Sequence, residues 1–344
     1  MTFGRWKLIM EKSLVYCARM AVGCLAAALA ISPAVGAERL KVTLNWTPDN
    51  SSIGIIYADA LGYYKQLGIE LEIEPGKGSG TSSQMVAAGS TDVGLVNAPS
   101  AIALAAKGAP LKIIAPIYQA SELGIISLED TAISRPKELE GKTIALPPGA
   151  AQSALFDVLV KQKRVDKSKV QILSADPSSY IGLLAERKVD GVSEAPAAVM
   201  IPLGERDVKT KTMFYKDNGA PILSTSLVAR DDKLKSNPEL YMKFVDATLR
   251  GYSAVAKDPE AAVEALRSRY PDEADKKEVL LKELRQYLLA DLCVPGASGL
   301  GKPPAKAWAT TGEILASTLG SLGDGGIDTK YTERYLPREV PPCP

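Results

Sequence analysis

The fold class is set by residues 40–73, which read LKVTLNWTPDNSSIGIIYADALGYYKQLGIELEI. The first six residues alternate apolar and polar side chains, which is typical of a half-buried strand, and residues 53–67 have the apolar spacing of a helix that ends at Gly68. Residues 69–73 alternate again as a second strand. A strand, a helix and a strand in this order predict a parallel βαβ unit.

The same order continues through most of the chain. Further strands are predicted at residues 92–96, 111–115, 143–146, 170–173, 189–193 and 222–228. Helices are predicted at residues 81–88, 98–107, 150–163 and 180–187, from about residue 196, and at 238–257, 259–269, 275–291 and 302–319. This order predicts an α/β fold of two lobes, each a mainly parallel sheet flanked by helices, with an extra C-terminal helical block.

The late helical block is expected to return to the first lobe. Residues 38–125 and 224–344 would then form lobe 1, and residues 126–223 would form lobe 2, with the crossovers near residues 121–127 and 222–229. A ligand site is expected in the cleft between the lobes, because ligands of open α/β sheets bind beyond the carboxyl ends of the strands.

Composition excludes several classes of protein. The chain has 344 residues, 46% of them hydrophobic, with 41 basic and 40 acidic side chains, so no basic excess directs it to nucleic acid. It contains no histidine, which excludes Ser-His-Asp and Cys-His catalysis and the usual zinc sites. No motif calls for a cofactor or a metal ion.

Residues 1–37 have the pattern of a signal peptide. A basic segment precedes the apolar stretch of residues 20–31, and residues 35–37 (VGA) form a cleavage site of small residues before Glu38. Export to the periplasm with cleavage after Ala37 is therefore predicted, and an uncleaved N-terminal anchor is the alternative. Cleavage leaves 37 basic and 39 acidic side chains, and the remaining cysteines, Cys293 and Cys343, are expected to pair as a structural disulfide. Two unpaired thiols are the alternative.

Several predicted strand-to-helix junctions carry side chains suited to a ligand. Trp46 would stack on a planar ligand, polar groups at helix starts would meet ligand oxygens, and Glu194 would suit an amine or an aminopyrimidine. The candidate ligand contacts are Trp46, Asp49, Asn50, Thr81, Ser82, Asn97, Tyr118, Gly149, Gln152, Ser153 and Glu194. For each of these the alternative is ordinary loop packing, helix capping or a solvated side chain.

Several motifs resemble those of the periplasmic solute-binding proteins of ABC importers, in the subgroup that handles nitrate, sulfonates, taurine and thiamine-pyrimidine precursors. The matching segments are residues 44–48 (LNWTP), 62–64 (GYY), 68–71 (GIEL), 88–94 (AGSTDVG), 141–149 (GKTIALPPG) and 189–192 (VDGV). The resemblance implies the type II binding-protein fold, whose two lobes close over a small molecule like a Venus flytrap and then dock on a membrane permease served by a cytoplasmic ATPase.

Within this family, residues 45–48 are most similar to the branch that binds pyrimidine precursors. By position, Trp46 would stack on the ring, and Asn97, Tyr118 and Glu194 would line the pocket. The resemblance implies a monomeric, non-catalytic binder of a thiamine-related pyrimidine. Sulfonate, nitrate, riboflavin-like and aromatic carboxylate ligands are alternatives, as are an exported ligand sensor and a hydrolase with a Ser-Lys pair or paired carboxylates.

One enzyme of this fold is also similar, the eukaryotic pyrimidine synthase of thiamine biosynthesis. The resemblance implies that such an enzyme consumes one of its own histidines and carries a cysteine cluster with iron. This chain has no histidine and no cysteine cluster, so the residues themselves disfavour the synthase.

Overall fold

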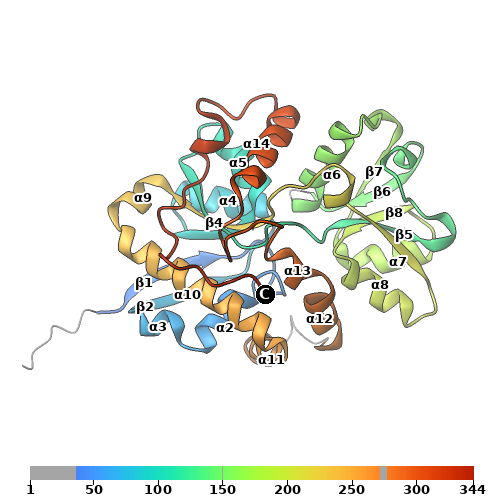
Figure 1. The fold of residues 1–344 in the computed structure, drawn as a ribbon. Coiled ribbons are helices and arrows are strands. Elements are labelled where there is room, and N and C mark those ends of the chain that lie inside the picture. The colour runs from blue at the N-terminus through green and yellow to red at the C-terminus, as the bar shows by residue number, and fades with distance from the viewer. Residues whose placement is uncertain (1–35, 149, 272–276) are drawn as a thin grey trace, which may run out of the picture. The chain divides into compact units, whose positions relative to one another are not determined.

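The computed structural model describes residues 36–148, 150–271 and 277–344, so nearly all of the predicted signal peptide lies outside the described residues. Residues 38–344 form one unit built on two sheets (Figure 1). No helix in the described part of the chain has both the length and the apolar character needed to cross a membrane.

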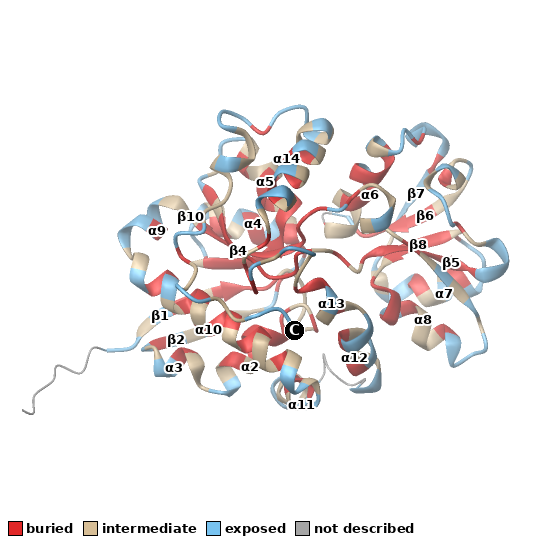
Figure 2. Cartoon of the chain, in the orientation of Figure 1, coloured by how far each residue is buried: buried red, intermediate tan, exposed pale blue. Residues whose placement is uncertain are grey.

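The first sheet has the strand order β2-β1-β3-β10-β4. These strands are β1 (Glu38–Thr43), β2 (Ile69–Glu74), β3 (Val93–Asn97), β4 (Leu111–Pro116) and β10 (Thr225–Arg230). Strand β1 is parallel to β2 and β3, whereas β10 is antiparallel to both of its neighbours. Figure 2 shows that the middle of this sheet is buried, as expected for strands covered on both faces.

The second sheet repeats this plan with the order β7-β6-β8-β5-β9. Its strands are β5 (Gly124–Leu128), β6 (Thr143–Leu146), β7 (Gln171–Ser174), β8 (Gly191–Glu194) and β9 (Thr210–Phe214). Strand β5 is antiparallel to β8 and β9, and the other pairings are parallel. The prediction of two mainly parallel sheets flanked by helices is confirmed.

Helices surround both sheets. Those that precede β10 are α2 (Ile53–Ala60), α3 (Tyr63–Gln66), α4 (Ser79–Ala88), α5 (Ala98–Ala106), α6 (Ala151–Gln162), α7 (Tyr180–Ala185) and α8 (Pro196–Gly204). Those that follow it are α9 (Asp231–Ser236), α10 (Pro238–Lys257), α11 (Pro259–Arg269), α12 (Lys277–Glu283), α13 (Leu289–Asp291) and α14 (Ala305–Leu319).

The C-terminal helices contact both lobes. Helices α10 and α11 pack on α2 beside the first sheet. In contrast, α12 contacts α8 and α14 contacts α6, and α6 and α8 are helices that flank the second sheet. The block therefore packs on the first lobe and also contacts the second lobe.

Two neighbouring segments carry the chain between the sheets, at residues 117–123 and 215–224. The amide of Tyr118 donates to the carbonyl of Thr225, and the amide of Ser224 donates to the carbonyl of Tyr118, both at 3.0 Å. The crossovers were predicted a few residues later, at positions that β5 and β10 largely occupy. The reason is that both strands are buried along almost their whole length within their sheets.

Two predicted helices are interrupted in the structure, and one observed strand was not predicted. The helix predicted at residues 53–67 is divided into α2 and α3 by Gly62, whose positive φ of 71° ends the first helix. The helix predicted at residues 275–291 contains a π-helical turn at Leu284–Leu288. Strand β9 was not predicted, because its sequence, TKTMF, is mostly polar and lies at the edge of its sheet.

Candidate functional site

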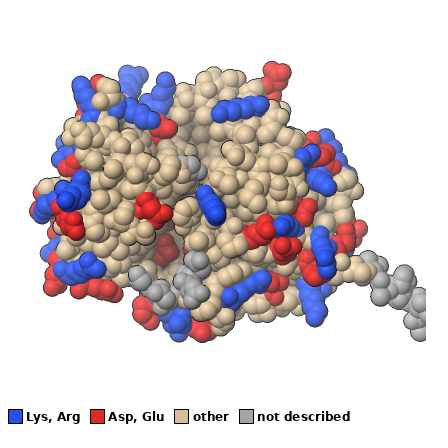
Figure 3. Space-filling model, turned by 180° about the vertical axis from the view of Figure 1, so that it is seen from behind, with Lys and Arg blue, Asp and Glu red and all other residues tan. Residues whose placement is uncertain are grey.

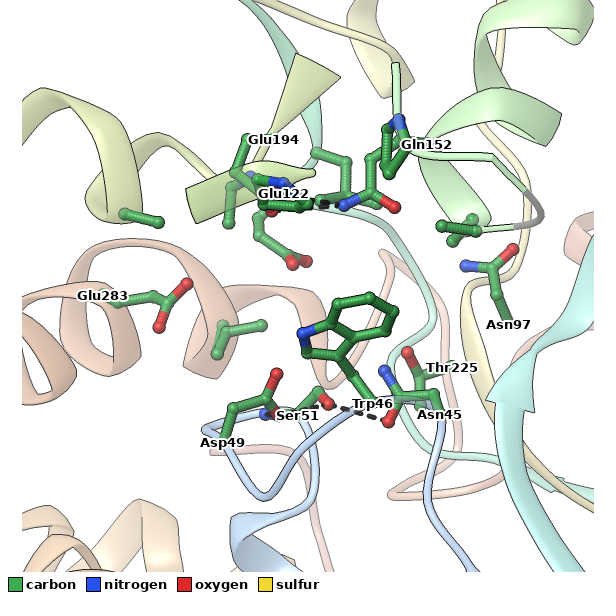
Figure 4. Close-up of a pocket in the computed structure, with 18 of the residues that line it drawn as sticks. Asn45, Trp46, Asp49, Ser51, Asn97, Glu122, Gln152, Glu194, Thr225 and Glu283 are labelled. Atoms are coloured by element: carbon green, nitrogen blue, oxygen red, sulfur yellow. Dashed lines mark hydrogen bonds between the residues drawn. The ribbon is translucent and has the colours of Figure 1, made fainter. Parts of the chain in front are cut away.

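A cleft of about 360 Å³ lies between the two sheets, at the carboxyl ends of β1, β3 and β8. Its walls come from both lobes, from the crossover segments and from α12. In Figure 4 the indole of Trp46 stands in the middle of the cleft, with Asp49 and Glu283 on one side and Asn97 and Thr225 on the other. The volume is that of a site for a small organic molecule.

A glycine contact holds the Trp46 loop in place. The amide of Gly76 donates to the carbonyl of Trp46, and the amide of Gly78 donates to the carbonyl of Asn45, both at 2.9 Å. A Cβ at residue 76 would lie 1.9 Å from the carbonyl oxygen of Leu44, so only glycine allows the two loops to approach this closely. This contact directs Asn45 and Trp46 into the cleft.

Asn97 ends β3 and begins α5. Its side chain is only 3% exposed, and its Nδ2 donates to Ser224 Oγ at 3.1 Å. Its amide donates to Ser79 Oγ at 3.0 Å. The Oδ1 atom is buried without a hydrogen-bond partner among the described residues, which is costly unless a ligand supplies a donor.

Glu194 ends β8 in the opposite lobe. The amide of Ala195 donates to its Oε1 at 2.8 Å, and Gln152 Nε2, in the first turn of α6, donates to both carboxyl oxygens at 3.2 and 3.3 Å. These bonds fix the carboxyl group in one orientation at the cleft wall, as Figure 4 shows.

Glu283, at the end of α12, reaches the cleft from the C-terminal block. Asn50 Nδ2 donates to its Oε2 at 2.6 Å and to the carbonyl of Leu280 at 2.9 Å. Asn50 is 1% exposed, so it anchors α12 against the Trp46 loop and orients Glu283. Nearby, the amide and hydroxyl of Ser51 donate to Asp49 Oδ1 at 2.8 and 2.5 Å.

The cleft is acidic. Burial is the main cause that raises the pKa of Glu122 to about 8 and the pKa values of Glu194 and Glu283 to about 7. Burial also raises the pKa of Asp49. The charge of Asp49 contributes to the shifts of all three glutamates, because like charges in one cleft disfavour ionisation. The described lining residues include no lysine or arginine.

The structure brings some of the predicted site residues together and places others elsewhere. Those that line the cleft are Trp46, Asp49, Asn97, Gln152 and Glu194. Those that lie outside its lining are Asn50, Thr81, Ser82, Tyr118 and Ser153. Gly149 lies outside the described residues.

The side chains outside the lining have structural partners or face solvent. Ser82 Oγ donates to the carbonyl of Leu44 at 2.7 Å, and Ser153 Oγ donates to the carbonyl of Pro147 at 2.6 Å. The ring of Tyr118 packs edge-on against Tyr252, and its hydroxyl donates to the carbonyl of Asn50 at 3.1 Å. Thr81 lies on the exposed face of α4. Tyr118 therefore contacts the segment that follows Trp46 from outside the lining of the cleft.

Sequence reasoning missed two acidic residues of the cleft, Glu122 and Glu283. Glu122 lies in the first crossover, within the segment predicted to join the lobes, so its position was a usable signal. Glu283 lies in a helix without any motif, and only the packing of α12 across the cleft brings it there.

Cys293 and Cys343 form a disulfide, which fixes the C-terminal tail to the loop after α13. The described residues contain no group of three or more His, Cys, Asp and Glu side chains that could hold a metal ion.

The family model described as NMT1/THI5 like matches residues 49–262. The relative 4-amino-5-hydroxymethyl-2-methylpyrimidine phosphate synthase THI12 of Saccharomyces cerevisiae is 25% identical over 65% of this chain and 69% of its own length. The riboflavin-binding protein RibY of Chloroflexus aurantiacus is 22% identical over 91% of both chains. The formylaminopyrimidine-binding protein of Halalkalibacterium halodurans is 21% identical over 74% of this chain and 77% of its own length.

Solved structures share the fold. The periplasmic aliphatic sulphonate binding protein SsuA of Escherichia coli has a TM-score of 0.63 at 14% identity, covering 88% of this chain and 95% of its own. The periplasmic nitrate-binding protein NrtA of Synechocystis PCC 6803 has a TM-score of 0.59 at 12% identity, covering 86% of both chains. These likenesses confirm the two-lobed α/β periplasmic binding fold. Because the family model spans more than half of the sequence, the chain belongs to the NMT1/THI5-like family.

Proposed function

We propose that this chain is an exported solute-binding protein that captures a thiamine-related pyrimidine in its cleft and delivers it to an ABC importer. The observation that carries the proposal is the position of Trp46, which stands in the cleft between hydrogen-bonding carboxyl and amide groups. An indole face suits a flat heterocycle, and fixed acceptors such as Glu194 suit its amino groups. Two relatives named above for pyrimidine chemistry or binding support this ligand class.

The same cleft disfavours two of the alternative ligands. A sulfonate or nitrate ion would be surrounded by carboxyl groups, with no lysine or arginine among the described lining residues. A flavin also has a flat ring with N–H donors, and the similarity to RibY favours it as the second candidate. The two candidates differ in size and in amino substituents, so direct binding separates them.

We propose that the protein binds its ligand without converting it. The yeast relative is named as a synthase, but this chain contains no histidine to act as a proton carrier, and its two cysteines after residue 37 are joined in a disulfide. Incubation of stoichiometric ligand with the protein should return the ligand unchanged by mass spectrometry. Conversion of the ligand would overturn the non-catalytic role.

A thermal-unfolding panel tests the ligand. The mature chain, from Glu38, would be melted with aminopyrimidines, thiamine, riboflavin, taurine, nitrate and aromatic carboxylates. A ligand present at 100 times its dissociation constant should stabilise the folded protein by about 2.7 kcal/mol. The shift should appear with aminopyrimidines, disappear in Trp46→Ala and persist in Thr81→Ala, a matched control on the exposed face of α4.

Other outcomes of the panel redirect the assignment. A shift with riboflavin alone would replace the pyrimidine by a flavin and retain the binding role. A shift with sulfonates alone would contradict the electrostatic argument. No shift with any compound would contradict the proposed ligand and favour a sensor that reports a different molecule to a membrane partner.

We also propose that the protein is a monomer, because residues of one chain complete the cleft. We propose that it lies in the periplasm, because residues 1–37 have the pattern of a signal peptide. Sedimentation of the mature chain should give a single species of monomer mass. A stable dimer whose interface covers the cleft mouth would contradict this.

A further inference from the structure

The charges of the cleft are one-sided. Four carboxyl groups line it, those of Asp49, Glu122, Glu194 and Glu283, and no basic side chain stands among the described lining residues. For a neutral solute this arrangement is costly wherever the carboxyl groups are ionised, because like charges in one cleft repel and lose hydration. The arrangement becomes favourable when a cation enters.

The carboxyl groups lie close enough to one another to interact. Glu194 is fixed by Gln152 and by the amide of Ala195, which makes it a rigid acceptor at the wall of the second lobe. The charge of Asp49 raises the pKa values of Glu122, Glu194 and Glu283. In Figure 4, Asp49 and Glu283 face the same side of the indole of Trp46. This side of the cleft therefore concentrates acidic groups, and a bound cation would favour their ionised form.

The opposite side offers neutral groups. Asn45, Asn97 and Thr225 lie there in Figure 4, and the buried Oδ1 of Asn97 has no partner among the described residues. An N–H group on the ring of a ligand would supply the missing donor. The cleft thus offers an aromatic platform, a neutral acceptor on one side and acidic groups on the other.

Resting on the proposed function, we infer that the ligand is a planar N-heterocycle that bears a primary ammonium group and enters the cleft as a cation. Its ring stacks on Trp46, its ring amino groups meet Asn97 and Glu194, and its ammonium group lies among Asp49, Glu122 and Glu283. The indole face adds a cation–π attraction. A metal ion does not fit as the cation, because the described acidic residues form no metal-binding group.

Three compounds that share one ring test this inference. Titration calorimetry at about pH 8 would compare 4-amino-2-methylpyrimidines that carry a 5-aminomethyl, a 5-hydroxymethyl or a 5-phosphooxymethyl arm. The arms are cationic, neutral and anionic, and the ring is constant. The aminomethyl compound should bind at least tenfold more tightly than the hydroxymethyl compound, and the phosphate should show no binding.

Variants locate the ammonium group. Glu283→Gln and Glu122→Gln should each weaken binding of the aminomethyl compound at least tenfold and change binding of the hydroxymethyl compound less than threefold. Glu278→Gln, an exposed residue of the same helix as Glu283, is the matched control and should change neither. The wild-type comparison does not depend on the variants, so a variant that fails to fold leaves the test intact.

The outcomes separate this inference from the proposed function. Equal or tighter binding of the hydroxymethyl or phosphorylated compound would overturn the inference and leave pyrimidine capture standing. Binding of benzylamine but not of benzyl alcohol, with none of the pyrimidines bound, would overturn the pyrimidine and leave the cationic site standing. Binding of none of these compounds would overturn both.

Discussion

At the scale of single residues, the cleft depends on side chains that orient others. Asn50 was predicted to contact the ligand, but its side-chain Nδ2 donates hydrogen bonds to Glu283 and to the carbonyl of Leu280. Ser82 and Tyr118 likewise hold the loops around Trp46. A polar residue at a strand end can either contact a ligand or hold a neighbouring loop, and the local sequence does not distinguish these two roles.

The Asn50 bonds give a prediction for a single variant. Asn50→Ala should destabilise the fold by about 1–3 kcal/mol, because two acceptors on α12 lose a hydrogen bond from a buried donor. The pKa of Glu283 should rise above its value of about 7, because the Asn50 hydrogen bond favours the ionised carboxylate. Urea unfolding and carbon NMR titration of Glu283 measure the two effects. An unchanged Glu283 titration would show that Asn50 does not hold this carboxyl group.

The sequence was informative for residues that directly follow strands. Trp46, Asn97 and Glu194 were predicted at strand ends and line the cleft, because the carboxyl ends of parallel strands meet there. Glu283 could not be found this way. It enters the cleft from a helix that lies more than two hundred residues after Trp46, and tertiary packing alone determines that approach.

At the scale of elements, α2 and α10 pack unusually closely through two glycines. A Cβ on Gly251 of α10 would lie 2.2 Å from the carbonyl oxygen of Gly54 in α2, and a Cβ on Gly54 would lie 2.3 Å from the ring of Tyr252. The hydroxyl of Tyr252 in turn donates to the carbonyl of Ser51 at 2.6 Å. The helix pair therefore supports the Trp46 loop from below.

This contact predicts a substitution effect. Gly251→Ala should destabilise the protein by about 1–3 kcal/mol, because the helices must separate. Gly182→Ala, at an exposed position of α7 with open space around it, should instead stabilise by about 0.5–1 kcal/mol. Chemical denaturation of both variants checks the pair. Equal effects would refute the close packing of α2 and α10.

The disulfide supports the crossover region. It fixes the tail to the loop after α13, and Gln119 of the first crossover bonds to this loop, with Nε2 donating to the carbonyl of Gly299 and Oε1 accepting from the amide of Val294, both at 3.1 Å. Cys343→Ser should lower stability by about 2–4 kcal/mol, because the unfolded chain loses a cross-link. The double variant with Cys293→Ser should match the single one in urea unfolding. A clearly larger loss in the double variant would indicate that Cys293 stabilises the fold without its partner.

Most elements were predictable because their apolar periodicity is strong. Helices α10 and α11 have the predicted bounds, and so does β6. The errors occurred where one residue or the tertiary context decides, as at Gly62, the π-helical turn after Glu283 and the edge strand β9.

At the scale of the whole molecule, charge is nearly balanced outside the cleft. On the face shown in Figure 3, basic and acidic side chains are interspersed, in keeping with the near-zero net charge of the sequence. The acidic groups of the cleft are therefore a local concentration, and they are not part of a generally acidic surface.

The cleft carboxyl groups predict a pH dependence of stability. The pKa values of Glu122, Glu194 and Glu283, about 8, 7 and 7 when folded, exceed the ordinary glutamate value of 4.5, so between these limits the folded state holds more protons than the unfolded state. The ligand-free protein should lose stability as pH rises from 5 to 8, by about 1.4 kcal/mol per pH unit for each proton involved. Exposed carboxyl groups with lowered pKa values, such as Asp232 at about 2, change the stability only in more acidic solution.

Urea unfolding at four pH values measures this dependence. A Glu122→Gln, Glu283→Gln double variant should show a flatter profile, because two of the titrating groups are removed. A wild-type profile that rises between pH 5 and 8 would contradict the assignment of protonated carboxyl groups to the empty cleft.

The central claim is that Trp46 holds a flat pyrimidine ligand in the cleft, and fluorescence tests it most directly. After residue 37 the chain has two tryptophans, and Trp308 is buried against Tyr331 away from the cleft lining. In a mature Trp308→Phe variant, confirmed as folded by thermal melting, all tryptophan emission comes from Trp46. Titration with 4-amino-5-aminomethyl-2-methylpyrimidine should quench this emission with a saturable, one-site curve. Emission that stays constant up to millimolar concentrations of the pyrimidine would contradict the account.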